Sequence, residues 1–140
     1  MIKHAWSLLA QNTVVDQTSN TLSIQVVVEN LNVSIPATNI PNEVVVPFNG
    51  QLIALLYRDD VSKIESAIFH FIFLSPSGET LLQGSQQAEF PKGKRNIRII
   101  GGLNGLKLRG EGIYRFEISL DNEHVQTLPL EVHLTPTVEA

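Results

Sequence analysis

The side chains best suited to chemistry in this sequence are six cations gathered in one segment. No acidic residue lies between positions 92 and 109, although the chain of 140 residues has a net charge of −4. The six cations are Lys92, Lys94, Arg95, Arg98, Lys107 and Arg109. Clustered positive charge attracts phosphate groups, and the glycines at 101, 102 and 105 would let backbone amides approach an anion. The segment is therefore a candidate patch for binding anions or nucleic acid.

Solvation and protein docking could also account for this basic segment. Charged side chains at a strand edge discourage strand-to-strand aggregation, and the same charges could dock onto an acidic protein. The segment has no aromatic residue, whereas proteins that bind single-stranded nucleic acid usually stack bases on aromatic rings. Solvation and protein docking are therefore favoured over nucleic-acid binding.

The residue types needed for metal binding or nucleophilic catalysis are missing or dispersed. The chain has no cysteine, which excludes thiol catalysis, disulfides and cysteine-based zinc sites. Its four histidines, at positions 4, 70, 124 and 133, lack the paired spacing of a metal site. We therefore predict no catalytic residue, no metal site and no cofactor, and keep an enzyme whose site is invisible in the sequence as an alternative.

Two acidic pairs lie in predicted loops, Asp59 with Asp60 and Asp121 with Glu123. Loops of β-sandwiches can bind Ca²⁺ with oxygen ligands of this kind. Acidic residues also form turns and keep them soluble, and we favour this structural role for both pairs.

A strand near the C-terminus is the clearest element of the sequence. Its apolar residues alternate with polar ones, as in a strand with one buried face: Tyr114, Phe116, Ile118 and Leu120. A tyrosine that opens such a strand just after Gly110-Glu-Gly112 resembles the tyrosine corner of Greek-key sandwiches. We therefore expect Tyr114 to have a structural role.

The same alternation recurs along the chain and predicts about eight strands with no helix. The fold class expected is all-β, a two-sheet antiparallel Greek-key (immunoglobulin-like) sandwich. A first strand would place Trp6 on one face, where we expect it to be structural. Residues 1–135 are expected to form a single domain and 136–140 a loose tail.

Prolines and changes of parity predict where these strands bend or lie at an edge. The stretch Glu43, Val44, Val45 and Val46 is flanked by prolines and is at best an edge strand, as is part of the strand around Pro129. A long strand from 22 to 35 changes parity at Asn30, so we expect a bulge or bend there. An exposed edge could pair with another chain.

The function expected from these features is a non-catalytic binding or assembly module that acts through protein–protein contact. The contact could form through an exposed strand edge or through the basic segment, with another protein or with a second copy of the chain. Edge pairing would support a homodimer, because it satisfies free backbone groups on both partners. No stretch approaches the roughly 20 apolar residues of a membrane helix, and no export signal is recognised. We therefore expect a cytoplasmic protein with no membrane partner and no identifiable small-molecule substrate.

Several short motifs, taken together, resemble a known family. They are Ala5-Trp-Ser-Leu-Leu-Ala10, Val15-Asp-Gln17 followed by Leu22-Ser23, Tyr57-Arg58 and Gly112-Ile-Tyr-Arg-Phe116. This combination is similar to a family of small uncharacterised bacterial proteins. The resemblance implies an immunoglobulin-like sandwich without an assigned activity, cofactor or catalytic residue, so it transfers no functional residue to this chain.

Overall fold

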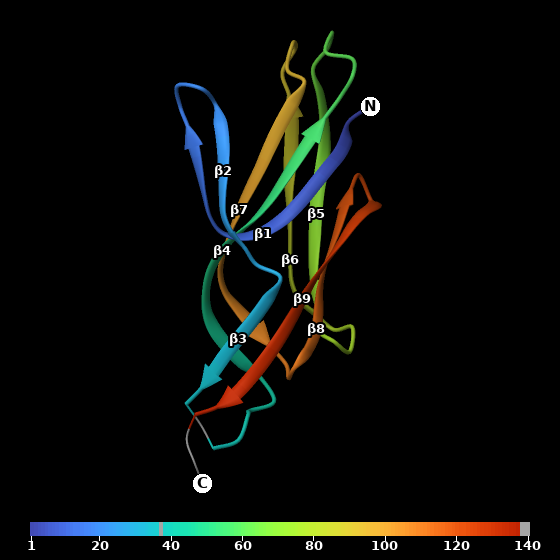
Figure 1. Ribbon diagram of the computed structural model, residues 1–140. Coiled ribbons are helices and arrows are strands. Elements are labelled where there is room, and N and C mark those ends of the chain that lie inside the picture. The colour runs from blue at the N-terminus through green and yellow to red at the C-terminus, as the bar shows by residue number, and fades with distance from the viewer. Residues whose placement is uncertain (37, 138–140) are drawn as a thin grey trace.

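The computed structural model describes residues 1–36 and 38–137, and every regular element within them is a β-strand. The expected all-β class is therefore confirmed, with nine strands rather than about eight. Figure 1 labels them in chain order. They are β1 (Lys3–Asp16), β2 (Thr21–Val27), β3 (Asn30–Ile35), β4 (Val44–Tyr57), β5 (Glu65–Leu74), β6 (Thr80–Phe90), β7 (Asn96–Leu108), β8 (Gly112–Leu120) and β9 (Glu123–Pro136).

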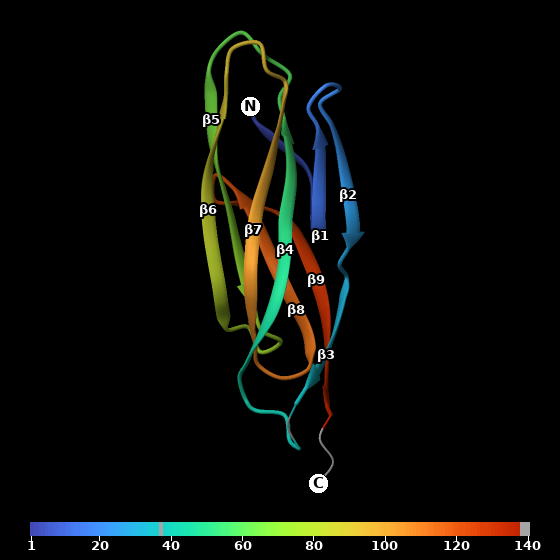
Figure 2. The ribbon, with the colours of Figure 1, turned by 90° about the vertical axis from the view of Figure 1, so that its left-hand side faces the viewer.

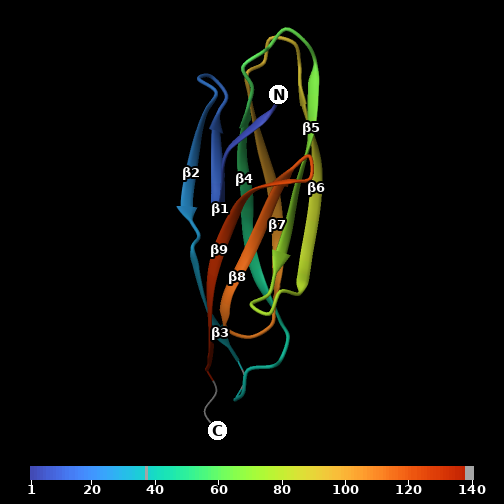
Figure 3. The same ribbon diagram turned by 90° about the vertical axis from the view of Figure 1, so that its right-hand side faces the viewer.

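The strands form two sheets that enclose one hydrophobic core. The first sheet has the order β2-β1-β4-β7 and the second the order β3-β9-β8-β5-β6. Figures 2 and 3 show β5 and β6 at one side of the molecule and the β1–β2 hairpin at the other. The core between the sheets takes large side chains from both, including Leu56 and Leu106 of the first and Phe73 and Phe116 of the second.

One strand pair departs from the expected antiparallel arrangement. β3 runs parallel to β9, with Asn30 opposite Glu131 and Ile35 opposite Pro136. The expectation of a purely antiparallel fold is therefore wrong for the second sheet. Parallel strands are not joined by a hairpin turn, so the pairing of β3 with β9 leaves no local signal in the sequence.

The expected bend near Glu29 and Asn30 marks a change of sheet. The chain leaves the first sheet after β2 and enters the second as β3. Val26 has a positive φ of 56°, and the Val28 amide donates a hydrogen bond of 2.7 Å to the Leu9 carbonyl. Both halves of the segment stay paired because each half joins a different sheet.

Val44, Val45 and Val46 do not form a separate strand but open the long strand β4, where they are paired on one side only among the described residues. They pair with β7 from Val44 opposite Leu108 onward. On the other side of β4, pairing with β1 begins only at Gln51 opposite Ala10, among the residues that the structure describes. Pro47 lies between these two regions, where the missing N–H costs the sheet little.

The hydroxyl of a tyrosine stabilises the connection between β7 and β8 through two hydrogen bonds. The Tyr114 hydroxyl accepts a hydrogen bond of 2.6 Å from the Arg109 amide and donates one of 2.7 Å to the Gly110 carbonyl. This is the hydrogen-bond pattern of a tyrosine corner. Burial raises the pKa of Tyr114 even though the Arg109 N–H opposes the shift.

The C-terminal residues lie beside β3. Pro136 still belongs to β9, and the Thr137 amide donates a hydrogen bond of 2.9 Å to the Ile35 carbonyl. The remainder of the expected tail, residues 138–140, lies outside the described residues. Within residues 1–36 and 38–137, no helix is long and apolar enough to span a membrane.

Candidate functional site

The β1–β2 hairpin, here residues 11–27, is the part of the chain that departs most from the two-sheet body. The first half of β1 pairs with β4 as far as Ala10, and the second half pairs with β2. Figure 1 shows β1 changing direction between these halves, so that the hairpin projects at the side of the molecule. Its tip is held by Asp16, whose carboxylate accepts the amides of Thr18 and Ser19 at 2.9 and 3.1 Å. The Ser19 and Thr18 amides lower the pKa of Asp16 below its usual range.

The outer edge of this hairpin is an open strand. β2 has β1 as its only neighbour in the sheet of the described chain. Residues 17–28 contain no charged side chain. Several apolar side chains of the hairpin face solvent, and Val26 is 60% exposed and Val27 43%. Charges and prolines usually blunt an edge strand, and β2 has neither.

A cleft of about 680 Å³, here called the hairpin cleft, lies between the hairpin and the outer face of the first sheet. Its apolar lining comes from β1, β2, β4 and β7: Trp6, Leu22, Ile24, Leu55 and Ile97. Its polar lining comes from the hairpin tip, the β6–β7 loop and β7: Asn20, Lys94, Arg95, Asn96 and Arg98. Trp6, which the sequence predicts to be structural, is half-buried and lines this cleft.

A buried arginine positions the loop that carries two of these cations. The Arg58 side chain is 0% exposed, and its guanidinium lies 5.1 Å from the centre of the Phe90 ring. It donates hydrogen bonds of 2.7–2.9 Å to the carbonyls of Lys63, Pro91 and Lys94. Because one rigid guanidinium joins the β4–β5 and β6–β7 loops, the position of Lys94 beside the cleft is set from the interior.

Arg95 and Arg98 are held by neutral acceptors. Arg95 donates to the carbonyls of Arg58 and Asp59 at 3.2 and 2.8 Å. Arg98 reaches across the cleft and donates to the carbonyl and the side-chain oxygen of Asn20 at the hairpin tip. Neither arginine has a carboxylate partner among the described residues, so both keep an uncompensated positive charge.

The structure divides the six cations of the basic segment. Lys94, Arg95 and Arg98 line the hairpin cleft, and Lys92 lies exposed in the loop beside them. The remaining two cations lie at the far end of β7, where they form ion pairs: Lys107 with Glu43 at 3.5 Å, and Arg109 with Glu43 and Glu79. The segment is therefore not one continuous patch.

The candidate edge residue Glu43 takes part in those ion pairs. Partial desolvation alone would raise its pKa, but the hydrogen bond from Arg109 and the charge of Lys107 outweigh it and lower the pKa of Glu43. Next to it, Val45 is 68% exposed and Val46 is buried. Glu43 thus ties the start of β4 to the distal cations of β7.

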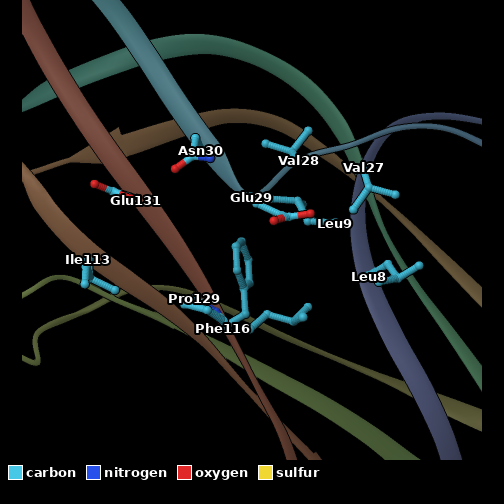
Figure 4. Close-up of a pocket in the computed structure, with 11 residues that line it drawn as sticks. Leu8, Leu9, Val27, Val28, Glu29, Asn30, Ile113, Phe116, Pro129 and Glu131 are labelled. Carbon is cyan, nitrogen blue, oxygen red and sulfur yellow. The ribbon is translucent and has the colours of Figure 1, made fainter.

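A second apolar pocket, of about 510 Å³, opens where the two sheets part beside β9. Figure 4 shows Phe116 at its base, with Leu9 and Glu29 on one side and Pro129 on another. Pairing of β3 with β9 begins at Glu131, so β9 has no partner strand on this side at Pro129 among the described residues. A proline fits there because no N–H is required. The strand around Pro129 is therefore at a sheet edge, as predicted.

Titratable side chains elsewhere serve local structure. Among the described residues, no group of three or more histidine or acidic side chains could hold a metal ion. The Asp121 carboxylate accepts the Ile68 amide at 2.8 Å. Asp60 accepts the hydroxyl and amide of Ser62 at 2.6 and 2.9 Å, which lowers the pKa of Asp60.

Reasoning from the sequence missed two features of these surfaces. It named Glu43 to Val46 and the strand around Pro129 as candidate edges and did not identify β2, the edge strand without charge or proline. The uncharged run from 17 to 28 was the available signal. It also noted that the basic segment has no aromatic residue, whereas Trp6 of β1 lines the same cleft as Lys94, Arg95 and Arg98. No signal links Trp6 to Arg98 locally, because 91 intervening residues separate them.

Comparison with known sequences relates the chain to a protein family. No curated protein matches its sequence. A family model described as a family of unknown function (DUF6941) matches residues 15–133, which include part of the β1–β2 hairpin and all the cations named above. This match covers well over half of the chain. The expected membership of an uncharacterised family is therefore confirmed, and the chain belongs to the family of unknown function DUF6941.

Proposed function

We propose that this protein is a non-catalytic assembly module that associates with a second copy of itself through the outer edge of β2. The observation that carries the proposal is an edge strand of seven residues with no charge, no proline and no neighbour on its outer side in the described chain. An open edge of this kind offers a row of free backbone donors and acceptors.

The remaining edges are less suited to pairing. β6 carries Glu89, and β7 carries Arg98 and Lys107, and charged side chains on an edge strand discourage pairing with another chain. β3 is uncharged as well, but its apolar residues Leu31 and Val33 already pack against the core. β2 is the edge that combines free backbone groups with exposed valines.

The β2 sequence is also compatible with itself. Antiparallel pairing centred on Ser23 would place Leu22 of one copy opposite Ile24 of the other, with no charge in the contact. A two-fold arrangement of this kind is closed and uses the same surface twice. The contact of two short strands is small, so we expect a weak dimer whose population depends on concentration.

Charge reversal at the centre of β2 tests this arrangement. The parent chain should show a rise in weight-average mass during sedimentation equilibrium between about 1 μM and 1 mM. Ser23→Glu and Ser23→Lys chains should each stay monomeric, because like charges would meet at the two-fold axis. An equimolar mixture of the two variants should recover the dimer.

The matched control is Ser85→Glu on β6, another exposed serine on an edge strand. It should dimerise as the parent does. A parent chain that stays monomeric throughout, or a mixture of the Ser23 variants that fails to recover mass, would eliminate self-pairing through β2.

Three further proposals follow from the sequence and the fold. An immunoglobulin-like relationship is supported by the tyrosine corner before β8 and by two facing sheets. A bacterial source is what the family resemblance implies. A cytoplasmic location is compatible with a chain that has no cysteine.

A further inference from the structure

We propose that the hairpin cleft binds a small amphipathic anion, an aliphatic or aromatic body that carries one carboxylate or phosphate group. This inference rests on the inner face of the hairpin and the outer face of the first sheet, and it does not depend on self-association through the β2 edge. The cleft combines the two recognition elements that such a ligand needs, an apolar floor and uncompensated positive charge.

The apolar floor is assembled from strands that are distant in sequence. Trp6 pairs with Leu55 across β1 and β4, so their side chains share the outer face of the sheet. Leu22 and Ile24 face them from β2. The side chain of Thr13, opposite Ile24 in the hairpin, donates a hydrogen bond of 2.7 Å to Gln51 of β4 and ties the hairpin to this face. These surfaces would bury an apolar body from two sides.

The positive charge lies at one end of this floor. Lys94, Arg95 and Arg98 line the cleft, and no carboxylate lines it among the described residues. Arg98 lies beside Leu55, its partner across β4 and β7, so the charge and the apolar surface are adjacent. The cations at the far end of β7 give an internal comparison, because Lys107 and Arg109 are already paired with Glu43. Of these two groups of cations, the one that lines the cleft is the one whose charge is free to bind an anion.

The size of the cleft favours a small organic ligand over a bare ion. Its volume of about 680 Å³ is that of a pocket for a ligand of drug size. An inorganic anion would leave the apolar floor in contact with water and gain nothing from it. A single-stranded nucleic acid would need further stacking positions, and the cleft lining holds one aromatic residue, Trp6, among the described residues.

Trp6 makes binding directly measurable, because it is the only tryptophan in the chain. Titration with decanoate should shift its fluorescence emission to shorter wavelength, since the ligand would displace water from the indole. Decyl phosphate should act likewise. Decanol, which lacks the charge, and inorganic phosphate, which lacks the apolar body, should each leave the emission unchanged at the same concentration.

Charge-matched variants locate the site. The double variant Lys94→Gln/Arg98→Gln should bind decanoate about tenfold more weakly, since two ionic contacts are lost. The variant Lys107→Gln/Arg109→Gln removes the same charge at the far end of β7 and should bind as the parent does. Because Arg98 also holds the hairpin tip, two further variants separate loss of charge from loss of structure. Arg98→Lys keeps the positive charge, and the single variant Lys94→Gln removes only an exposed loop cation.

Several results would overturn the proposal. They are unchanged Trp6 emission at saturating decanoate, equal responses to decanoate and decanol, and equal loss of affinity in the two charge-matched double variants. A short oligothymidylate that binds more tightly than decyl phosphate would also overturn it, in favour of nucleic acid.

Discussion

β8 and the β1–β2 hairpin arise from similar sequence patterns and end in opposite environments. Along β8, Tyr114, Phe116 and Ile118 are all 0% exposed. Along the hairpin, Val14 is 48% exposed and Val26 60%. Alternation of apolar and polar residues predicts a strand in both places, but only a covering second sheet turns one face of the strand into core.

The two regions also differ in how they are held. The ends of the two-sheet body are tied by buried side chains that bond to backbone groups, Tyr114 at one connection and Arg58 at another. The hairpin is tied by exposed or half-buried polar contacts, among them Thr13 with Gln51 and Arg98 with Asn20. Two-stranded ribbons are marginal on their own, so the hairpin should open locally far more readily than β8.

The largest expected effect in this comparison comes from Arg58→Met. The change leaves the carbonyls of Lys63, Pro91 and Lys94 without their buried donor, so the free energy of unfolding should fall by about 3 kcal/mol. Urea denaturation measures it. Arg115→Met is the control, because Arg115 is exposed and lies 3.9 Å from Glu117; it should cost less than about 0.5 kcal/mol. Similar losses in both variants would show that Arg58 does not tie the loops.

Tyr114→Phe tests the tie at the β7–β8 connection. It removes a hydroxyl that both accepts from Arg109 and donates to Gly110, and should lower the free energy of unfolding by about 2 kcal/mol. Tyr57→Phe, on a half-buried ring, is the matched control and should change it little. If the two tyrosine variants unfold at the same urea concentration, the corner contributes no special stability.

The junction between hairpin and body should gain stability from Val26→Gly. Val26 has a φ of 56°, which strains a β-branched residue and is easy for glycine. Because its side chain is mostly exposed, relief of the strain should raise the free energy of unfolding by about 1 kcal/mol. Val27→Gly, one residue further along β2, should instead lower it. A loss of stability in both glycine variants would contradict a strained junction.

The smallest effect is a pH dependence from His4. Its ring nitrogen lies 2.6 Å from the Ser7 hydroxyl, and burial lowers the pKa of His4 below its ordinary value of 6.5. Between 6.5 and the lowered value, the unfolded chain binds more protons than the folded chain, so stability falls as the pH falls. The contribution of neutral His4 to the free energy of unfolding is fully present above pH 6.5. Urea denaturation at a series of pH values should show that the free energy of unfolding depends less steeply on pH in His4→Gln than in the parent. An identical pH dependence in the two chains would exclude a contribution from His4.

Much of the fold followed from local pattern. The strand β8, which runs through the core, carries apolar residues at every second position and was predicted close to its bounds. The start of β4 and the parallel pairing of β3 were not predicted. Whether Pro47 fits within a strand, and where the short β3 pairs, both depend on which strand lies beside them. The alternation of apolar and polar residues along a strand does not indicate which distant strand pairs with it.

The binding surfaces were predicted less completely than the strands. The cations of the basic segment were identified from the sequence, but their division between the hairpin cleft and the Glu43 ion pairs was not. The two groups lie toward opposite ends of β7, a strand of 13 residues, and an extended chain rises about 3.3 Å with each residue. The two groups of cations are therefore close in sequence but far apart in the structure.

By itself, the sequence determined an all-β chain without cysteine chemistry, with a tyrosine placed to close a corner and a row of cations near one strand. The tertiary structure alone decided which edge stays open, that Trp6 lies beside Arg98, and that Lys107 and Arg109 are neutralised. The physical reason is that alternation and turn residues act over a few positions. Strand pairing and charge neutralisation depend instead on neighbours that only the folded chain brings together.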